Sequence, residues 1–570
     1  MKLHTRLNLG YVIASLVIIG TYGCKSEPKT QAPIVTVPQS KMAAGNTVGA
    51  VSEISGYAAV RVNGFGLVYG LTDTGSSEAP PTQKAYLIQH IRRYKDRLPK
   101  PYNKMTAEQI IESRSTAIVA VSGVVPPGAP KGEAFDVEVT ILPQTQTTSL
   151  QGGTLMFTEL RLITAQEGGT LAGRTTASAE GPVFINPFPL TARIADPNAA
   201  SVRNDKSDPR RGKVLGGGHS MYNRQIKLSI YQADYRLASL IERRVNTRFG
   251  GANSPKIADA KGRDTILINI PQDFEHRYQY FISLLANLYL EERPGLMELH
   301  LRQLVDEAKM PTAKPARLEE IALSWEAIGK DCLTFIKPLF ANAHDNLAYY
   351  AAKTCVNLGD LSGMDTLILI ANDDNNPNQL KATKQLSDIA REPRALRARG
   401  ALLQLLNKPN NRVRLLAYEG LRNCRDPRIR IAEMPGGFTL ERAPSTAENL
   451  VCVWTVDQPR LVLLGQDWKC REDIFVELDD GAVTLNQQPP QDKISISRKT
   501  EDGVSFIRTQ SSLRVEDLIY TLGMPLEKDT EEPPILTFSQ IVGLIYRMCQ
   551  DQKVIPATFY LHRVAEDLLG

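Results

Sequence analysis

The sequence predicts a multidomain α+β protein, and three observations lead to that prediction. The chain has 570 residues, which is too many for one hydrophobic core. Its 42% hydrophobic and 23% charged residues are typical of a folded chain. Regions 45–300 and 431–570 mix short strands with helices, whereas region 312–430 has a helical period. We therefore expect a β-rich body that carries a segment of helical repeats.

The N-terminus predicts export across a membrane. Lys2 and Arg6 precede an uncharged, mostly apolar stretch from Leu7 to Gly23. A short basic head followed by an apolar stretch and small residues is typical of an export signal, so residues 1–23 are predicted to be a signal peptide. Because the stretch is near the lower length limit of a spanning helix, an uncleaved anchor is the second interpretation.

Cys24 follows the predicted signal directly. The order Thr21-Tyr22-Gly23-Cys24 resembles a bacterial lipoprotein processing site. Under that hypothesis Cys24 carries lipid and anchors the chain to the outer membrane, and under the alternative the signal is an ordinary one. Residues 24–44 are rich in Pro, Gln, Ser and Thr, which predicts a flexible tether.

Export implies an oxidising compartment, in which the six cysteines other than Cys24 could form disulfides. Cys452 and Cys470 flank two strand-like runs, and a disulfide closing that loop would stabilise the fold by roughly 3 kcal/mol. The alternative is that both are buried free thiols. The chain has no C-x-x-C pair, which argues against a zinc site or a thioredoxin-like motif.

Region 312–430 contains an internal repeat. Residues 346–360 align with residues 412–426 at a constant offset of 66, which suits two intervals of about 33 with a weaker copy at 380–389. Each copy has an apolar i, i+4, i+8 stripe that needs neighbouring helices to bury it, so the copies resemble HEAT-like repeats. A binding face and a structural spacer are both compatible with so few repeats. The matched positions are Leu347 with Val413, Ala351 with Ala417, Cys355 with Leu421 and Asp360 with Asp426.

Strands in region 45–300 are predicted from alternating valines. Val119 and Val121 alternate with small residues, and Val137 and Val139 alternate with polar ones, as in half-buried strands. The pair Pro126-Pro127 should end a strand, because proline lacks a ladder donor. The pair Gly152-Gly153 predicts a tight turn or a bulge.

Two runs in this region resemble the bacterial flagellar P-ring protein family. The first is GFGLVYGLTDTG at residues 64–75. The second extends from the apolar strand at 117–121, through PPGAPKG at 126–132, to SLQGGTL at 149–155. The resemblance covers about residues 45–290, and the strands and closing helices of 438–570 suit a resumption of the same body after the helical insertion.

The resemblance implies a structural function. A member of this family is expected to be a periplasmic subunit that assembles with copies of itself into a ring around the flagellar rod. The implied partners are the rod, the outer ring proteins and peptidoglycan. The hypothesis that competes with it is a lipid-anchored periplasmic adaptor that binds a partner through its helical repeats. The family-motif positions, which become assembly candidates, are Gly64, Gly66, Gly70, Gly75, Ser149, Gly152 and Gly153.

The residues give no support for catalysis or for a cofactor. Gly64, Gly66 and Gly70 are spaced one residue too far for a dinucleotide-binding fingerprint. The chain has no H-E-x-x-H zinc motif and no G-x-S-x-G nucleophile elbow. Its net charge of +5 is small for its length and gives no reason to expect a nucleic-acid partner. We therefore expect no enzyme activity, no cofactor and no metal.

Overall fold

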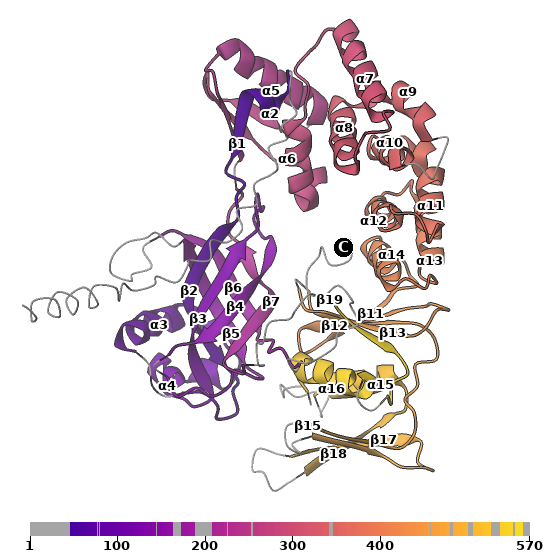
Figure 1. Cartoon of the computed structure of the whole chain (residues 1–570). Coiled ribbons are helices and arrows are strands. Elements are labelled where there is room, and N and C mark those ends of the chain that lie inside the picture. The colour runs from indigo at the N-terminus through magenta and orange to yellow at the C-terminus, as the bar shows by residue number, and fades with distance from the viewer. Residues whose placement is uncertain are drawn as a thin grey trace, which may run out of the picture. The chain divides into compact units, whose positions relative to one another are not determined.

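The computed structural model describes most of the chain from residue 46 onward (Figure 1). Every described residue belongs to the larger of two units, Gln39–Gly570. The predicted signal peptide, Cys24 and the tether lie outside the described residues. The described ranges are 46–76, 78, 80–143, 145–162, 173–188, 208–224, 226–251, 255–340, 346–456, 458–478, 483–499, 506–525, 536–550 and 553–562.

Six strands close into a barrel. They are β2 (Val60–Tyr69), β3 (Thr116–Val125), β4 (Ala134–Ile141), β5 (Thr154–Leu162), β6 (Thr175–Pro182) and β7 (Arg211–Ser220). Their order is β2-β3-β4-β7-β6-β5, and every neighbouring pair is antiparallel. The predicted alternation is confirmed, because Val119 and Val121 of β3 and Val137 and Val139 of β4 fill the barrel interior.

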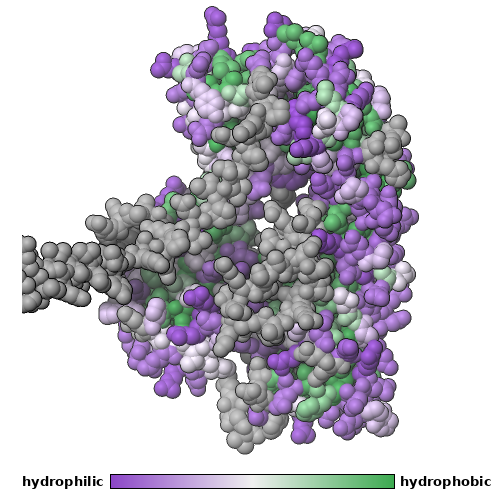
Figure 2. All heavy atoms as spheres, viewed as in Figure 1, coloured by the Kyte–Doolittle hydropathy of each residue, from purple (hydrophilic) through white to green (hydrophobic). Residues whose placement is uncertain are grey.

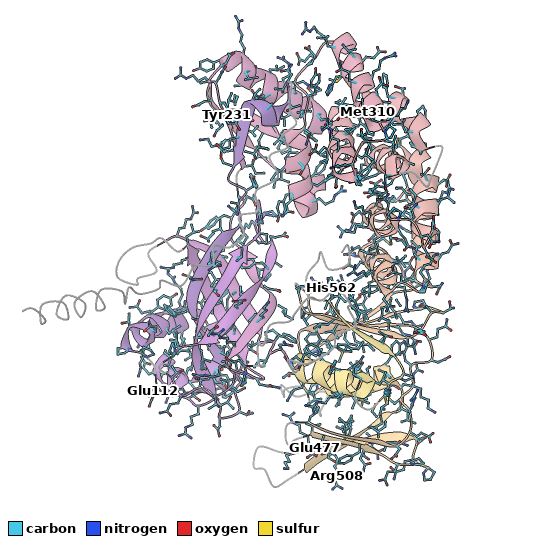
Figure 3. All side chains as sticks on the ribbon, in the orientation of Figure 1. Glu112, Tyr231, Met310, Glu477, Arg508 and His562 are labelled. Atoms are coloured by element: carbon cyan, nitrogen blue, oxygen red, sulfur yellow. The ribbon has the colours of Figure 1, made fainter. Side chains whose placement is uncertain are left out.

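Helices cover one outer side of the barrel. These are α3 (Pro81–Tyr94) and α4 (Ala107–Ile111), with the short turns η1 (Lys95–Arg97) and η2 (Tyr102–Lys104) between them. Leu87, Ile91 and Ile110 pack against outward-facing barrel residues in a second apolar cluster. Lys84 of α3 also forms an ion pair at 2.7 Å with Glu112, which Figure 3 labels just beyond α4.

A smaller α/β unit is built from segments on both sides of the barrel strands in the sequence. It contains α2 (Val48–Val51), β1 (Ser52–Ser55), β8 (Ile226–Ile230), α5 (Tyr235–Phe249), β9 (Ala258–Ala260), β10 (Thr265–Ile268), η3 (Gln272–Arg277) and α6 (Tyr278–Ala286). Its antiparallel sheet has the order β1-β8-β10-β9. Asp234 caps α5, since its side chain accepts a hydrogen bond from the backbone N–H of Arg236 at 2.8 Å.

The helical segment forms two layers. Its elements are α7 (Pro294–Ala308), α8 (Pro315–Ile328), η4 (Lys330–Cys332), α9 (Leu333–Ile336), η5 (Lys337–Phe340), α10 (Asn346–Asn357), η6 (Leu361–Gly363), α11 (Met364–Asn372), α12 (Gln379–Ile389), α13 (Leu396–Leu405) and α14 (Asn411–Asn423). Helices α10, α12 and α14 contact one another in series, while α11 and α13 form the second layer. The predicted stripes are buried, with Ala351, Cys355, Ala417 and Leu421 all fully inaccessible.

A buried polar ladder joins the small α/β unit to the helical segment. The hydroxyl of Tyr280 donates to Glu326 on α8. The Asn357 side-chain amide on α10 donates to that carboxylate at 2.9 Å, and the Gln385 amide on α12 donates to Asn357 at 2.6 Å. Arg248 of α5 donates to the backbone carbonyl of Glu326 at 2.6 Å. These bonds link α5 and α6 of the small unit to α8, α10 and α12, so they fix the first part of the helical segment to that unit.

The C-terminal region contains two sheets and two helices. Its elements are β11 (Arg430–Met434), β12 (Phe438–Ala443), β13 (Leu450–Trp454), β14 (Arg460–Leu464), β15 (Ile474–Leu478), β16 (Val483–Gln487), β17 (Lys493–Lys499), β18 (Phe506–Ser512), α15 (Val515–Gly523), α16 (Phe538–Gln550) and β19 (Thr558–His562). The sheet orders are β11-β12-β14-β13-β19 and β15-β16-β17-β18. The prediction that helices close the chain was wrong for β19, which pairs in parallel with β13 after α16.

Strand β13 is buried on both faces. Leu450, Cys452 and Trp454 belong to the core of the helical segment, whereas Val451 and Val453 belong to the core beneath α15 and α16. Such a strand has a continuous apolar sequence because neither face meets water. The five-stranded sheet is therefore a wall shared by two cores.

A buried carboxylate joins the last helix of the segment to this sheet. Glu441 on β12 is fully inaccessible and accepts hydrogen bonds from Arg422 on α14 at 2.8 and 2.9 Å. The hydroxyl of Thr439 donates to it at 2.8 Å, and the hydroxyl of Tyr418 donates as well. A desolvated carboxylate with this many donors is well satisfied.

The segment that follows β6 joins the barrel to the C-terminal core. The backbone N–H of Ile185 donates to the buried hydroxyl of Ser539 on α16 at 2.9 Å. The ring of Phe188 lies 5.4 Å from that of Tyr546 and 5.8 Å from that of Phe559. Both halves of the chain therefore meet through aromatic contacts between residues far apart in the sequence.

Hydrophilic side chains predominate among the coloured residues of Figure 2, with smaller groups of hydrophobic residues between them. The exposed apolar side chains that Figure 3 labels include Tyr231, which is 60% exposed, and Met310, which is 54% exposed. His562 at the end of β19 is instead buried, with its ring 4.8 Å from that of Trp454. Isolated exposed apolar residues are normal on a folded surface.

Glu326 should make stability depend on pH. Burial raises the pKa of Glu326 above its ordinary value. A raised carboxyl pKa favours folding at low pH, and this contribution is lost as the pH rises from the ordinary carboxyl range through the folded pKa. Glu326→Gln, which mimics the protonated acid, should therefore melt higher than the parent at pH 8 and close to it at pH 5. Thermal unfolding at both pH values checks this, and a variant that melts lower at pH 8 would contradict it.

Glu441→Gln should destabilise the junction between α14 and the sheet. The substitution removes the charge that Arg422 needs, and breaking a buried pair costs roughly 3–5 kcal/mol. Glu433→Gln on the neighbouring strand is the matched control, because Glu433 is exposed. Thermal unfolding of both variants is the measurement. Equal melting temperatures for the two would show that the junction is not held by this pair.

Candidate functional site

The glycines of the first motif lie where the barrel closes. Gly64 and Gly66 are on β2 and face β5, and the pairing of the two strands shifts register between Asn63 and Val68. A Cβ on Gly64 would lie 2.5 Å from the carbonyl oxygen of Glu159. A Cβ on Gly66 would lie 2.5 Å from the hydroxyl of Thr158. Only a residue without a side chain lets the two strands approach this closely.

The end of the same motif turns the chain away from β2. Gly70 has a φ of +83°, a conformation that favours glycine. Gly75 lies so close to the next strand that a Cβ would be 2.1 Å from the carbonyl oxygen of Thr116. Its backbone N–H donates to the carbonyl of Arg114 at 2.9 Å. This loop is therefore pinned to the start of β3.

The second motif packs directly against the first. The hydroxyl of Thr74 donates to the carbonyl of Ser149 at 2.9 Å. Gly152 has a φ of +78°, and a Cβ on Gly153 would lie 2.3 Å from Val68. The structure therefore brings all seven predicted positions into one region, which is the closure of the barrel and the turns at its end. The predicted tight turn at Gly152-Gly153 is present.

The seven positions shape the backbone, and only one of them, Ser149, has a polar side chain. Six are glycines, and the hydroxyl of Ser149 accepts a hydrogen bond from the backbone N–H of Gln151 at 3.1 Å. Within the described ranges no three His, Cys, Asp or Glu side chains are placed to hold a metal ion together.

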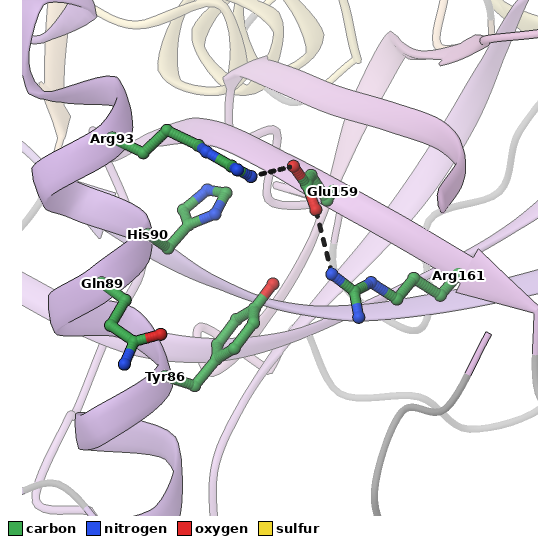
Figure 4. Close-up of a pocket in the computed structure, with 6 residues that line it drawn as sticks. All are labelled: Tyr86, Gln89, His90, Arg93, Glu159 and Arg161. Carbon is green, nitrogen blue, oxygen red and sulfur yellow. Dashed lines mark hydrogen bonds and ion pairs between the residues drawn. The ribbon is translucent and has the colours of Figure 1, made fainter. Parts of the chain in front are cut away.

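A polar pocket of about 320 Å³ lies on the outer face of β5, one of the two strands that close the barrel (Figure 4). Helix α3 and strand β5 form its walls. Side chains three and four positions apart on a helix share a face, and alternate residues of a strand share a face. This spacing was present in the sequence, but nothing in the sequence paired the helix with this strand. The lining residues are Tyr86, Gln89, His90, Arg93, Glu159 and Arg161.

Glu159 is the centre of this pocket. It accepts hydrogen bonds from the hydroxyls of Tyr94 at 2.8 Å and Thr175 at 3.3 Å, and from the guanidinium of Arg161 at 3.1 Å. Arg93 forms an ion pair with it at 3.5 Å. Burial raises the pKa of Glu159, but the hydrogen bonds from Tyr94, Arg161 and Thr175, together with the nearby His90, outweigh burial and bring that pKa below its ordinary value.

His90 is buried beside that carboxylate. Its Nε2 lies 2.7 Å from the backbone carbonyl oxygen of Phe157, so Nε2 carries the proton that this bond requires. Burial lowers the pKa of His90, which favours the neutral imidazole. The rings of Tyr86 and His90 are stacked with centroids 5.9 Å apart. An aromatic surface therefore lies beside the charged side chains.

The predicted pairing of Cys452 with Cys470 is not formed. Both are free, buried thiols, which is the alternative that the sequence left open. Cys452 belongs to the core of the helical segment and Cys470 to the core beneath α15 and α16, so the shared sheet separates them. Burial raises the pKa of Cys470 to about 12. Such thiols are protonated and unreactive at neutral pH.

Comparison with known proteins supports the resemblance seen in the motifs. The family described as Flagellar P-ring protein matches residues 48–295. Relatives named "Flagellar P-ring protein" are 28% identical over 275 residues in Geobacter metallireducens and 29% identical over 232 residues in Campylobacter lari. "Flagellar P-ring protein 1" of Yersinia pestis is 26% identical over 256 residues. The N-terminal half of this chain resembles the flagellar P-ring proteins.

The similarity covers only part of this chain and part of each relative. The three matches cover 46%, 40% and 44% of this chain, and 66%, 59% and 62% of the respective relatives. The chain therefore spans less than two thirds of the P-ring proteins that it matches. Residues 48–295 contain the barrel, its closure motifs and the small α/β unit, as the expected range 45–290 predicted. Helices α8 to α14 and the C-terminal sheets lie beyond the match.

Among the described residues, every helix is too short or too polar to cross a membrane. The predicted export signal is outside that search, because it precedes the described residues. The export signal and the lipid on Cys24 therefore stay predictions.

Gly64→Ala should destabilise the P-ring-like region. The added Cβ would meet a backbone oxygen of β5 at 2.5 Å, and strand backbone cannot shift as a side-chain end can. Overpacking of this kind costs roughly 1–3 kcal/mol. Gly400→Ala is the control, because Gly400 is on α13 with no atom near its added Cβ, and alanine favours a helix. If thermal unfolding shows the same midpoint for both variants, the closure is not constrained at Gly64.

Cys470 and Cys549 should resist alkylation in the folded protein. Burial raises the pKa of each thiol to about 12, so both are protonated at neutral pH and closed to a reagent. Cys424 is the control, because it is only half-buried. Peptide mapping after brief iodoacetamide treatment at about pH 7.5 is the measurement, and modification of Cys470 or Cys549 before Cys424 would contradict the prediction.

Proposed function

We propose that this protein is a structural subunit of a periplasmic flagellar basal-body ring. Copies of it assemble around the rod and form a bushing in which the rod turns. The observation that carries the proposal is the match of residues 48–295 to the flagellar P-ring family. The matched region contains the glycines at which the barrel closes. Identical subunits contact one another head to tail, through two different surfaces, because such heterologous contacts generate a ring when their rotation closes.

The physical character of the described region supports this function. A bushing needs a rigid subunit, and a closed barrel has no free strand edge. The glycines at the closure hold β2 against β5 with no room for a side chain, which fixes the shape of the barrel. The family-motif turns meet at the end of the closure, where Gly70 and Gly152 are exposed and are the candidate positions for contact with the next subunit. Gly75 and Gly153 pack against Thr116 and Val68 and hold these turns in place.

The proposal extends to the partners of the ring, its compartment and its attachment to the membrane. The partners are the rod, the outer ring proteins and peptidoglycan, and the compartment is the periplasm. Lipid on Cys24 would hold the N-terminus at the outer membrane, and residues 24–44 would connect it to the folded part. The protein acts by assembly and not by catalysis.

Electron microscopy of isolated basal bodies tests the proposal. The protein carries a C-terminal tag and is expressed at its natural level in the native organism, and an untagged strain is the control. Label on a ring around the rod supports the ring subunit. Label elsewhere in the envelope, with unlabelled rings intact, overturns it.

The helical segment favours a second candidate, a periplasmic adaptor. It lies beyond the matched region and is held at both ends, by the ladder at Glu326 and by the pair of Arg422 and Glu441. A segment that is fixed in this way presents its helices as a stable surface, as HEAT-like stacks do. In this candidate, the barrel is a reused scaffold and the helical repeats bind the partner.

Deletion of residues 316–429 separates the two candidates. Ring assembly without the segment, with loss of one crosslinked envelope partner, supports an adaptor added to a ring subunit. Retention of every crosslinked partner contradicts the adaptor. The deletion removes Arg422, the partner of Glu441, and Glu419, the partner of Arg460, so the variant also carries Glu441→Gln and Arg460→Gln. It also uncovers Leu450, Cys452 and Trp454 of β13, so a cooperative thermal unfolding transition of the variant is the control that it is folded.

A further inference from the structure

The pocket between α3 and β5 contains more positive charge than its fold requires. The carboxylate of Glu159 already accepts hydrogen bonds from Tyr94, Thr175 and Arg161. The ion pair of Arg93 with this carboxylate is longer, at 3.5 Å, and the Arg93 side chain is 70% exposed. Arg93 is therefore not needed to satisfy Glu159, and its guanidinium keeps donors for a further acceptor.

The charges of the pocket sum to one positive. Arg93 and Arg161 contribute two positive charges and Glu159 one negative charge, while burial favours neutral His90. Arg97 does not change this sum, because it forms an ion pair with Glu180 at 3.4 Å. A site with a surplus arginine attracts an anion, and a guanidinium fork matches the two oxygens of a carboxylate.

The other walls restrict the ligand further. The ring of Tyr86 is half-buried and stacked with His90, so one flat aromatic face borders the charged side chains (Figure 4). The amide of Gln89 adds a donor and an acceptor. A volume of about 320 Å³ is at the small end of the range for ligand pockets, which suits one sugar ring or one amino acid.

We propose that this pocket binds a carboxylate group carried by a unit the size of one sugar or one amino acid. Arg93 binds the carboxylate oxygens, Tyr86 packs against the body of the unit, and Glu159 holds Arg161 in place. The proposal does not depend on the ring function, because it rests on these side chains alone. Two sources share this chemistry, a sugar acid and an amino-acid carboxylate, and the Tyr86 contact distinguishes them.

Ligand-observed NMR on the full chain tests the proposal at constant ionic strength. The charged probes are D-glucuronate and N-acetylglycine, and the uncharged controls are D-glucose and N-acetylglycinamide. We expect saturable binding of a charged probe with a Kd on the order of 1 mM and no saturable binding of its uncharged control. A carboxylate that binds no better than its control overturns the proposal.

Arg93→Gln and Arg92→Gln are the matched variants. Arg93→Gln should raise the Kd about tenfold, because it removes one charge-assisted contact. Arg92 is next to it in the sequence and pairs instead with Glu108 at 2.7 Å, so Arg92→Gln should leave the Kd unchanged. Unaltered melting temperatures confirm that both variants fold. Equal binding by the parent and Arg93→Gln overturns the proposal.

Tyr86→Leu identifies the source of the carboxylate. It should weaken glucuronate several-fold and leave N-acetylglycine unchanged if the ligand is a sugar acid, because only the sugar has a ring to pack on tyrosine. Weakening of neither probe, with Arg93 still required, supports an amino-acid carboxylate. Saturable binding of the uncharged controls that Tyr86→Leu weakens would indicate a general apolar surface and contradict the proposal.

Discussion

The close approach of β2 and β5 is the constraint on which the N-terminal half depends. A barrel closes only when its first and last strands pair, and here the pairing shifts register beside Gly64 and Gly66. A side chain at either position would collide with β5. The same pairing fixes the outer face of β5 against α3, so the closure also positions Glu159 and Arg161 in the polar pocket.

The C-terminal half depends on a different constraint, the burial of β13 on both faces. Its alternate residues enter two cores, one shared with the helical segment and one beneath α15 and α16. The second core also takes up Phe188 from the segment after β6. The P-ring-like region, the helical segment and the C-terminal sheets are therefore joined through apolar burial, and the polar networks at Glu326 and Glu441 fix the helical segment between its neighbours.

Much of the fold was predictable, because local periodicity reports burial. The alternating valines at Val119, Val121, Val137 and Val139 predicted half-buried strands, and the constant offset within the helical segment predicted helices that stack. Strand β19 was missed, since a short strand after a helix has no periodicity of its own and depends on pairing with β13. The suggested bridge from Cys452 to Cys470 was wrong because the sheet between them separates their side chains into two cores.

The sequence by itself determined the family resemblance and the positions that carry it. Gly64, Gly66 and Gly153 could be named from the two motif runs before their neighbours were known, because glycine is the residue that permits close backbone approach. Only the tertiary structure decided what those neighbours are, and it placed both motifs at one closure. It alone assembled the pocket, because Tyr86 and Arg93 lie on a helix, Glu159 and Arg161 lie on a strand, and no local pattern encodes a contact between segments so far apart.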